Sequence, residues 1–179
     1  MPSPPTSIAP FYADWAGYNR RMVEHLRSLS AEDLALTAGD ERGWPIWAIA
    51  AHTVGARVYW LCHVLGEPGA EGTPFSDPSG FGWEDDLEHV RTGAEVADAW
   101  ESTWRVVEGC LERWTPDMLD ETVDRNGRTG VHRYSRQSIL LRLITHEGYH
   151  AGEISLVEGI HHRPQLDPWP PGGWLVEGG

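Results

Sequence analysis

The segment from Ser135 to Gly159 constrains the fold of this chain more than any other. Its apolar stripe recurs every three or four positions, as in a helix with one buried face, and the stripe comprises Ile139, Leu143, His146, His150, Ile154 and Val157. Ser135 is a good N-cap, so we expect the helix to begin there and to end near Gly159. The two histidines on the stripe need partners, because an unsatisfied buried polar group costs roughly 1–3 kcal/mol.

Three further segments have helical spacing, at residues 8–28, 45–65 and 93–114. Four helices of about 20 residues predict an all-α fold, a four-helix bundle. A length of 179 residues suits a single domain over residues 1–179, with an extended, proline-containing tail after His161. The Asn126-Gly127 pair is a tight-turn signal and predicts a small hairpin within residues 122–134.

The connection between the second and third helices is unusually long. Residues 66–86 are rich in glycine and proline and show no periodicity. A loop of this length inside a compact domain is usually functional or a crossover. We expect it to cross the length of the bundle, so that the helices it joins can run parallel, and to border a pocket or a dimer interface with exposed Phe75, Phe81 and Trp83.

The charge of the chain excludes two classes of partner. The formal net charge is −13, with 14 basic and 27 acidic residues. Nucleic-acid phosphates and anionic membrane surfaces both need a basic protein face, so we expect neither partner. His52, Arg57 and His63 interrupt the apolar second helix, which therefore suits a buried helix better than a membrane span.

The compartment predicted from the sequence is the cytoplasm. The chain has two cysteines, Cys62 and Cys110, both within helical patterns. Two buried, reduced thiols are typical of a cytosolic protein. The first residues contain neither a basic start nor an apolar run, so we expect no signal peptide.

Three histidines are candidate ligands of one metal ion. His146 and His150 stand four residues apart and share one helix face, where both rings can reach one ion. His52 interrupts the inward stripe of the second helix, next to the small residues Gly55 and Ala56. Three imidazoles with one or two open positions would suit divalent zinc or nickel. The alternative is three unrelated core or surface histidines.

The remaining histidines are weaker candidates. His63 shares the stripe of His52 but lies roughly 16 Å further along the helix. His25 and His89 have the spacing of surface residues. The others are expected in turns: His132, His161 and His162.

Two glutamates beside the histidines are candidate catalytic groups. In the H-E-x-x-H pattern of metalloproteases, Glu147 would be the general base. The longer metzincin motif needs glycine and histidine where this chain has Glu153 and Leu156, so a peptidase is disfavoured. Glu147 is then expected to be solvated or to lie behind the metal ligands. Glu153 follows His150 by three residues and could orient its ring.

Two stretches of the chain resemble the DinB/YfiT-like superfamily of metal-binding four-helix bundles. They are PIWAIAAHTVGARVYWL at residues 45–61 and SILLRLITHEGYHAGEISLV at residues 138–157. The resemblance implies a metal triad of His52, His146 and His150. The family includes thiol S-transferases that use bacillithiol or mycothiol, and a mycothiol-dependent isomerase domain.

Two kinds of function follow as hypotheses. The first is a metal-dependent enzyme acting on a small-molecule substrate, as a thiol S-transferase with bacillithiol or mycothiol as co-substrate or, alternatively, as a hydrolase. The second is a non-catalytic metal-binding or dimerisation module. In either case we expect a cytoplasmic homodimer.

Overall fold

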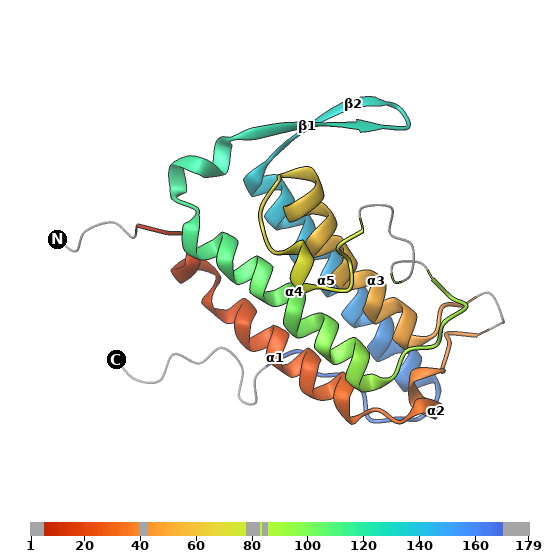
Figure 1. Ribbon diagram of the computed structural model, residues 1–179. Helices are drawn as coiled ribbons and strands as arrows, with labels where there is room; N and C mark the ends of the chain where they lie inside the picture. The colour runs from red at the N-terminus through yellow and green to blue at the C-terminus, as the bar shows by residue number, and fades with distance from the viewer. Residues whose placement is uncertain (1–5, 40–42, 78–82, 84–85, 170–179) are drawn as a thin grey trace, which may run out of the picture.

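A computed structural model describes residues 6–39, 43–77, 83 and 86–169, and it is mostly helical with one small two-stranded sheet (Figure 1). Its helices are α1 (Ala13–Ser28), α2 (Ala31–Leu34), α3 (Ile46–Val58), α4 (Gly93–Arg113) and α5 (Arg136–Ile160). The strands are β1 (Thr122–Gly127) and β2 (Gly130–Ser135). Shorter helical turns lie at Ala9–Tyr12, Ala70–Gly72 and Pro116–Asp120, and a π-helical turn at Tyr59–Val64 continues α3.

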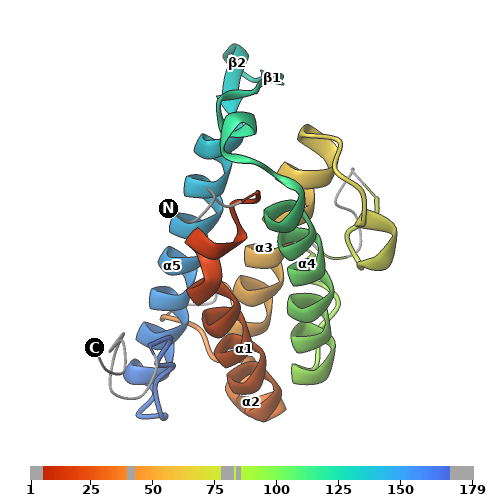
Figure 2. The same ribbon diagram turned by 90° about the vertical axis from the view of Figure 1, so that its left-hand side faces the viewer.

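The long helices pack side by side, with α3 between α4 and α5, and with α1 against α4 (Figures 1 and 2). The α3 and α4 helices run parallel: Trp100 Nε1 donates to the Ala50 carbonyl, and further along both helices Arg57 contacts Thr103. This is the parallel run predicted from the long connection between them. The α5 helix runs the opposite way, since its first residue, Arg136, contacts Glu67 beyond the end of α3.

Local sequence signals define where the helices begin. Ser135 accepts a hydrogen bond from the backbone N–H of Ser138, which confirms the predicted N-cap of α5. Thr92 and Glu95 form a capping box at the start of α4, satisfying backbone N–H groups that the helix leaves unpaired. Gly93 follows, and a Cβ there would lie 2.6 Å from the Leu26 carbonyl oxygen. The close approach of α4 to the end of α1 therefore needs glycine.

The hairpin forms in the predicted region, although its turn is displaced. Thr122 pairs with Ser135 and Gly127 with Gly130, so the two-residue turn is Arg128-Thr129 rather than Asn126-Gly127. Gly130 has a φ of 118°, in the region that favours glycine, and so allows the return strand to start there. The hairpin projects beyond the ends of the helices (Figure 2). The predicted all-α class therefore becomes a mostly helical fold with one small sheet.

The connection between α3 and α4 differs from its prediction. Phe75 was expected to be exposed, but its side chain is only 5% exposed and its ring packs against Trp83 at a centroid distance of 5.5 Å. Phe75 belongs to the hydrophobic core beneath the loop, and removing its ring from water stabilises the fold. Phe81 lies outside the described residues. Pro68 and Glu71 border a hollow of about 420 Å³ against α4.

Two further predictions concern the cysteines and the hydropathy of the helices. Cys62 and Cys110 are both free thiols and buried, as expected. Within the described residues, no helix combines the length and the hydropathy that a membrane-spanning segment needs.

Candidate metal centre

His52 occupies a special place on α3. Every other residue of this helix is buried, and His52 alone is partly exposed. A helix that is apolar on nearly all sides belongs in the centre of a domain. Its single partly exposed position is therefore where α3 can present a polar group to an incoming ligand.

The α5 helix brings two more imidazoles to His52. His146 and His150 are one turn apart, with ring centroids 4.5 Å from each other and each 5.1 Å from the ring of His52. One potential ligand atom from each of the three residues lies within 4.8 Å of the others. The structure therefore brings together the three histidines that the sequence singled out, in a geometry that could hold one metal ion.

The nitrogens at the centre of the cluster suit a cation. His146 Nε2 and His52 Nε2 face each other at 3.3 Å. Burial, followed by the charges of His150, His52 and Arg142, lowers the pKa of His146 to about 4. His146 is thus neutral at pH 7, which is the form that binds a metal. Its Nδ1 is buried and has no hydrogen-bond partner among the described residues.

Glu153 holds the third imidazole in place. His150 Nδ1 lies 2.8 Å from a carboxylate oxygen of Glu153, so the ring N–H donates to the carboxylate and leaves Nε2 for the cluster. This is the contact predicted from their spacing, and such outer contacts fix ring orientation in metal sites. Burial lowers the pKa of His150, while the Glu153 contact opposes that shift. Trp44 packs edge-on against His52 and Tyr149 against His150, so aromatic rings flank the cluster.

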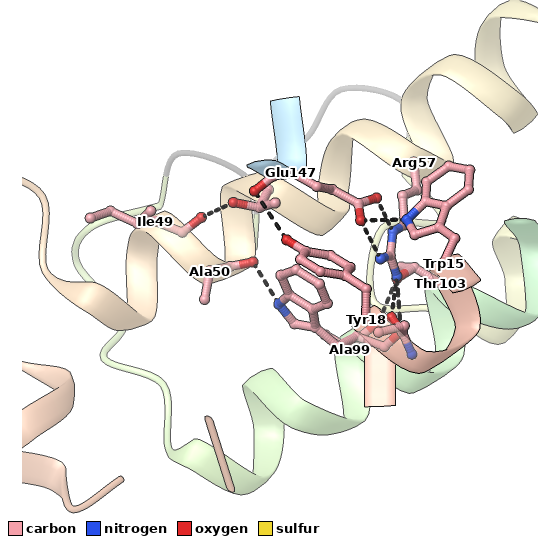
Figure 3. Close-up of polar contacts among 11 residues, drawn as sticks. Trp15, Tyr18, Ile49, Ala50, Arg57, Ala99, Thr103 and Glu147 are labelled. Carbon is pink, nitrogen blue, oxygen red and sulfur yellow. Dashed lines mark hydrogen bonds and ion pairs between the residues drawn. The ribbon is translucent and has the colours of Figure 1, made fainter. Parts of the chain in front are cut away.

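Glu147 is buried rather than solvated. Its side chain is only 1% exposed, which contradicts the solvated alternative. Arg57 Nε and Nη2 donate to its two carboxylate oxygens at 2.7 and 2.9 Å, and Trp15 Nε1 donates at 2.8 Å (Figure 3). Tyr18 donates its hydroxyl to the Glu147 backbone carbonyl. A carboxylate held by three donors in the core is poorly placed to act as a base at the cluster.

Arg57 is the residue that sequence reasoning missed. It is 0% exposed, and its remaining nitrogen, Nη1, contacts Asn19, Thr103 and the Trp100 carbonyl. A buried charge must be paired, so an arginine inside an apolar helix does signal a carboxylate partner. The sequence alone cannot say which carboxylate, because Glu147 is 90 residues away.

Other titratable side chains stand apart from this centre. His63 Nε2 donates to the Phe75 carbonyl at 3.1 Å. His25, expected at the surface, is partly buried and lies 2.5 Å from the buried carboxylate of Glu158. Burial raises the pKa of Cys62 to about 11 and that of Cys110 to about 12. Both thiols are therefore protonated at pH 7 and poor nucleophiles.

Fold and site together define a class: a mostly helical protein with a cluster of three histidines between two packed helices. The model of the DinB superfamily matches residues 17–154, and the chain belongs to that superfamily. Its structure is similar to the crystal structure of a DinB-like protein from Bacillus cereus, with a TM-score of 0.69 and 18% sequence identity, over 90% of this chain and 97% of that one. The comparison with curated proteins finds no match.

Proposed function

We propose that this protein is a metal-dependent enzyme in which His52, His146 and His150 hold one divalent ion, zinc or nickel. The observation that carries the proposal is the convergence of three imidazoles, one of them neutral at pH 7 and one oriented by Glu153. Three nitrogen ligands suit either ion and leave coordination positions open. The four long helices would then form the four-helix bundle that the family resemblance implies.

The reaction we propose is transfer of a low-molecular-weight thiol, bacillithiol or mycothiol, to an electrophilic small molecule. When bound, the ion lowers the pKa of a thiol and so supplies a sulfur nucleophile at neutral pH. The thiol sulfur bonds to the electrophilic carbon, the leaving group departs with its electron pair, and the thiol proton passes to solvent. The protein's own thiols do not compete, because Cys62 and Cys110 are buried and protonated.

The chain's residues support this reaction by position. Glu153 fixes the ring of His150, and Trp44 packs against His52, so both imidazoles are held before a ligand arrives. Tyr149 is 71% exposed beside His150 and offers an apolar surface to a substrate approaching from solvent. A hydrolase of the H-E-x-x-H kind is less well supported, since Arg57 and Trp15 engage both oxygens of Glu147.

We propose further that the enzyme acts as a cytoplasmic homodimer on small molecules, without nucleic acid or membrane partners. Four large apolar side chains on the outer side of α5 support self-association, and each is at least 48% exposed: Leu141, Tyr149, Leu156 and Ile160. The net charge of −13 supports the absence of phosphate-rich partners.

The proposal is tested by elemental analysis of protein purified without a histidine tag or a nickel column. We expect about one divalent ion per chain in the wild type and less than about a tenth of that in His52→Ala, His146→Ala and His150→Ala, since each removes one of three ligands. His63→Ala is the matched control and should keep its metal. Stoichiometric metal in all three cluster variants would overturn the proposal.

Turnover is then measured with metal-loaded protein, each thiol in turn and a chlorodinitrobenzene electrophile. We expect thiol consumption in the wild type that chelation and the His146→Ala variant abolish. Metal bound without turnover of thiol or ester substrates would favour the non-catalytic module. Ester cleavage without thiol transfer would favour the hydrolase.

A further inference from the structure

A second cavity lies on the other side of α5 from the histidines. It is a groove of about 690 Å³ between α1 and α5, and residues 166–169 also line it. Gly148 lines it, and on a helix that position is about 200° around the axis from His146. The groove is therefore separate from the proposed metal site, although both are built on α5.

Two glycines open part of the α5 side of the groove. Gly148 and Gly152 lie one turn apart on α5, and a Cβ at either would meet nothing within 4 Å. Glycine inside a helix costs about 0.5–1 kcal/mol relative to alanine. Close packing does not require glycine at either position, because a Cβ would fit at both. The two glycines therefore leave open space on this face of the groove.

Aromatic rings form the walls. Tyr12, Trp15 and Tyr18 line the α1 side, and Phe11 and Trp169 stand at the edges, 70% and 59% exposed. The volume of the groove, about 690 Å³, is in the range of cavities that hold small molecules. Exposed rings around a cavity offer their electron-rich faces to an apolar ligand or to a cation.

The charges at the groove are of one sign. Asp14 and Asp167 line it, as does Glu147, whose charge Arg57 already balances, and no basic side chain is among the described lining residues. Arg21 lies nearby and remains positively charged, with its Nε donating to the Pro168 carbonyl at 2.7 Å, but it does not line the groove. The two lining carboxylates of Asp14 and Asp167, beside several aromatic faces, favour a positively charged ligand over an anion.

We propose that the α1–α5 groove is a binding site for a hydrophobic organic cation, such as an arylalkyl ammonium. The ring system occupies the space over Gly148 and Gly152, between the aromatic side chains of α1 and the segment 166–169. The ammonium group lies among aromatic faces and near the carboxylates of Asp14 and Asp167. This site is independent of the proposed metal and needs none.

The test compares three probes that share one ring system: naphthylmethylammonium, naphthylmethanol and naphthylacetate. Binding to full-length protein is measured by calorimetry with a chelator present. We expect the cation to bind about tenfold more tightly than the alcohol, and the anion to bind least. His146→Ala should bind the cation like the wild type, so failure of the metal proposal would not affect this result.

Two sets of variants locate the probe. Gly152→Leu places a side chain in open groove space and should weaken the cation at least about tenfold, whereas Gly39→Leu, also in open space but in a loop, should not. Asp14→Asn with Asp167→Asn should bring the affinities of cation and alcohol together, and Asp117→Asn should leave them apart. Circular dichroism checks the fold of each variant.

Three outcomes would overturn the proposal. The first is equal affinity for the three probes, and the second is cation binding that Gly152→Leu leaves unchanged. The third is no binding of any probe by a protein whose dimer Gly152→Leu dissociates, which would assign the groove to a second copy of the chain.

Discussion

His146 and Glu147 are adjacent in sequence, yet they belong to opposite kinds of environment. His146 faces α3 in a partly exposed cluster whose nitrogens have room for a ligand. Glu147 points into the core, where Arg57 and Trp15 engage both of its carboxylate oxygens. A step of about 100° around a helix is enough to separate them. The H-E-x-x-H pattern therefore contributes its histidines to a candidate site and its glutamate to the core.

The two environments also differ in what a substitution should do. Removing an imidazole from the histidine cluster removes a metal ligand and should leave the fold intact, since the partly exposed imidazoles have solvent as an alternative partner. Removing one member of the Arg57–Glu147 pair leaves the other charge buried without its counter-charge. Measuring stability and metal affinity on the same variants tests whether the two environments differ in this way.

The largest effect on stability is expected for Glu147→Ala. It should lower the free energy of unfolding by about 3–5 kcal/mol, because Arg57 would remain charged and unpaired in the core. Urea denaturation of chelated protein measures it, with Glu153→Ala as the control, expected within about 0.5 kcal/mol of the wild type. The double variant Arg57→Met/Glu147→Leu should recover much of the loss. An unchanged urea midpoint for Glu147→Ala, together with lost turnover, would instead make Glu147 a base.

For metal affinity we expect the reverse order, with a larger effect of Glu153 variants than of Glu147 variants. The effects in free energy are smaller than the loss of stability in Glu147→Ala. Glu153→Ala should weaken binding about 10- to 100-fold, because His150 loses the acceptor that fixes its ring. Glu153→Gln should weaken it less, since the amide oxygen can still accept the Nδ1 proton, but more than Glu147→Gln does in its folded fraction. Competition with a chromophoric chelator measures all three. A larger defect in Glu147→Gln would revive the hydrolase hypothesis.

How far the sequence predicts this molecule depends on how local the signal is. Helical spacing and the Ser135 cap place α5 within one or two residues, because they depend on neighbours along the chain. The histidine cluster was predictable too, since His52, His146 and His150 interrupt inward stripes. The hairpin turn was displaced by two residues, as tight-turn signals compete locally and strand pairing decides between them.

Three further features that the sequence did not predict depend on long-range packing. Arg57 was seen as an interruption of an apolar helix, and its partners come from α1, α4 and α5. Phe75 was expected to be exposed because its segment has no periodicity, yet it packs into the core beneath the loop. The groove between α1 and α5 depends on where residues 166–169 return, which no pattern within either helix specifies.

The smallest expected effect is a dependence of the free energy of unfolding on pH, which we attribute to His146 of the histidine cluster. Burial holds the pKa of His146 at about 4, below its usual value of 6.5, so the unfolded chain binds a proton that the folded chain does not between these values. Stability of the metal-free protein should therefore be full above pH 6.5 and fall as the pH drops toward 4. We expect a loss of about 1 kcal/mol between pH 7 and pH 5, because partial exposure reduces the penalty. His146→Gln should flatten this slope in urea titrations, whereas His63→Gln should keep it. An unchanged slope in His146→Gln would mean that other groups dominate the acid response and that the cluster is less buried than its geometry indicates.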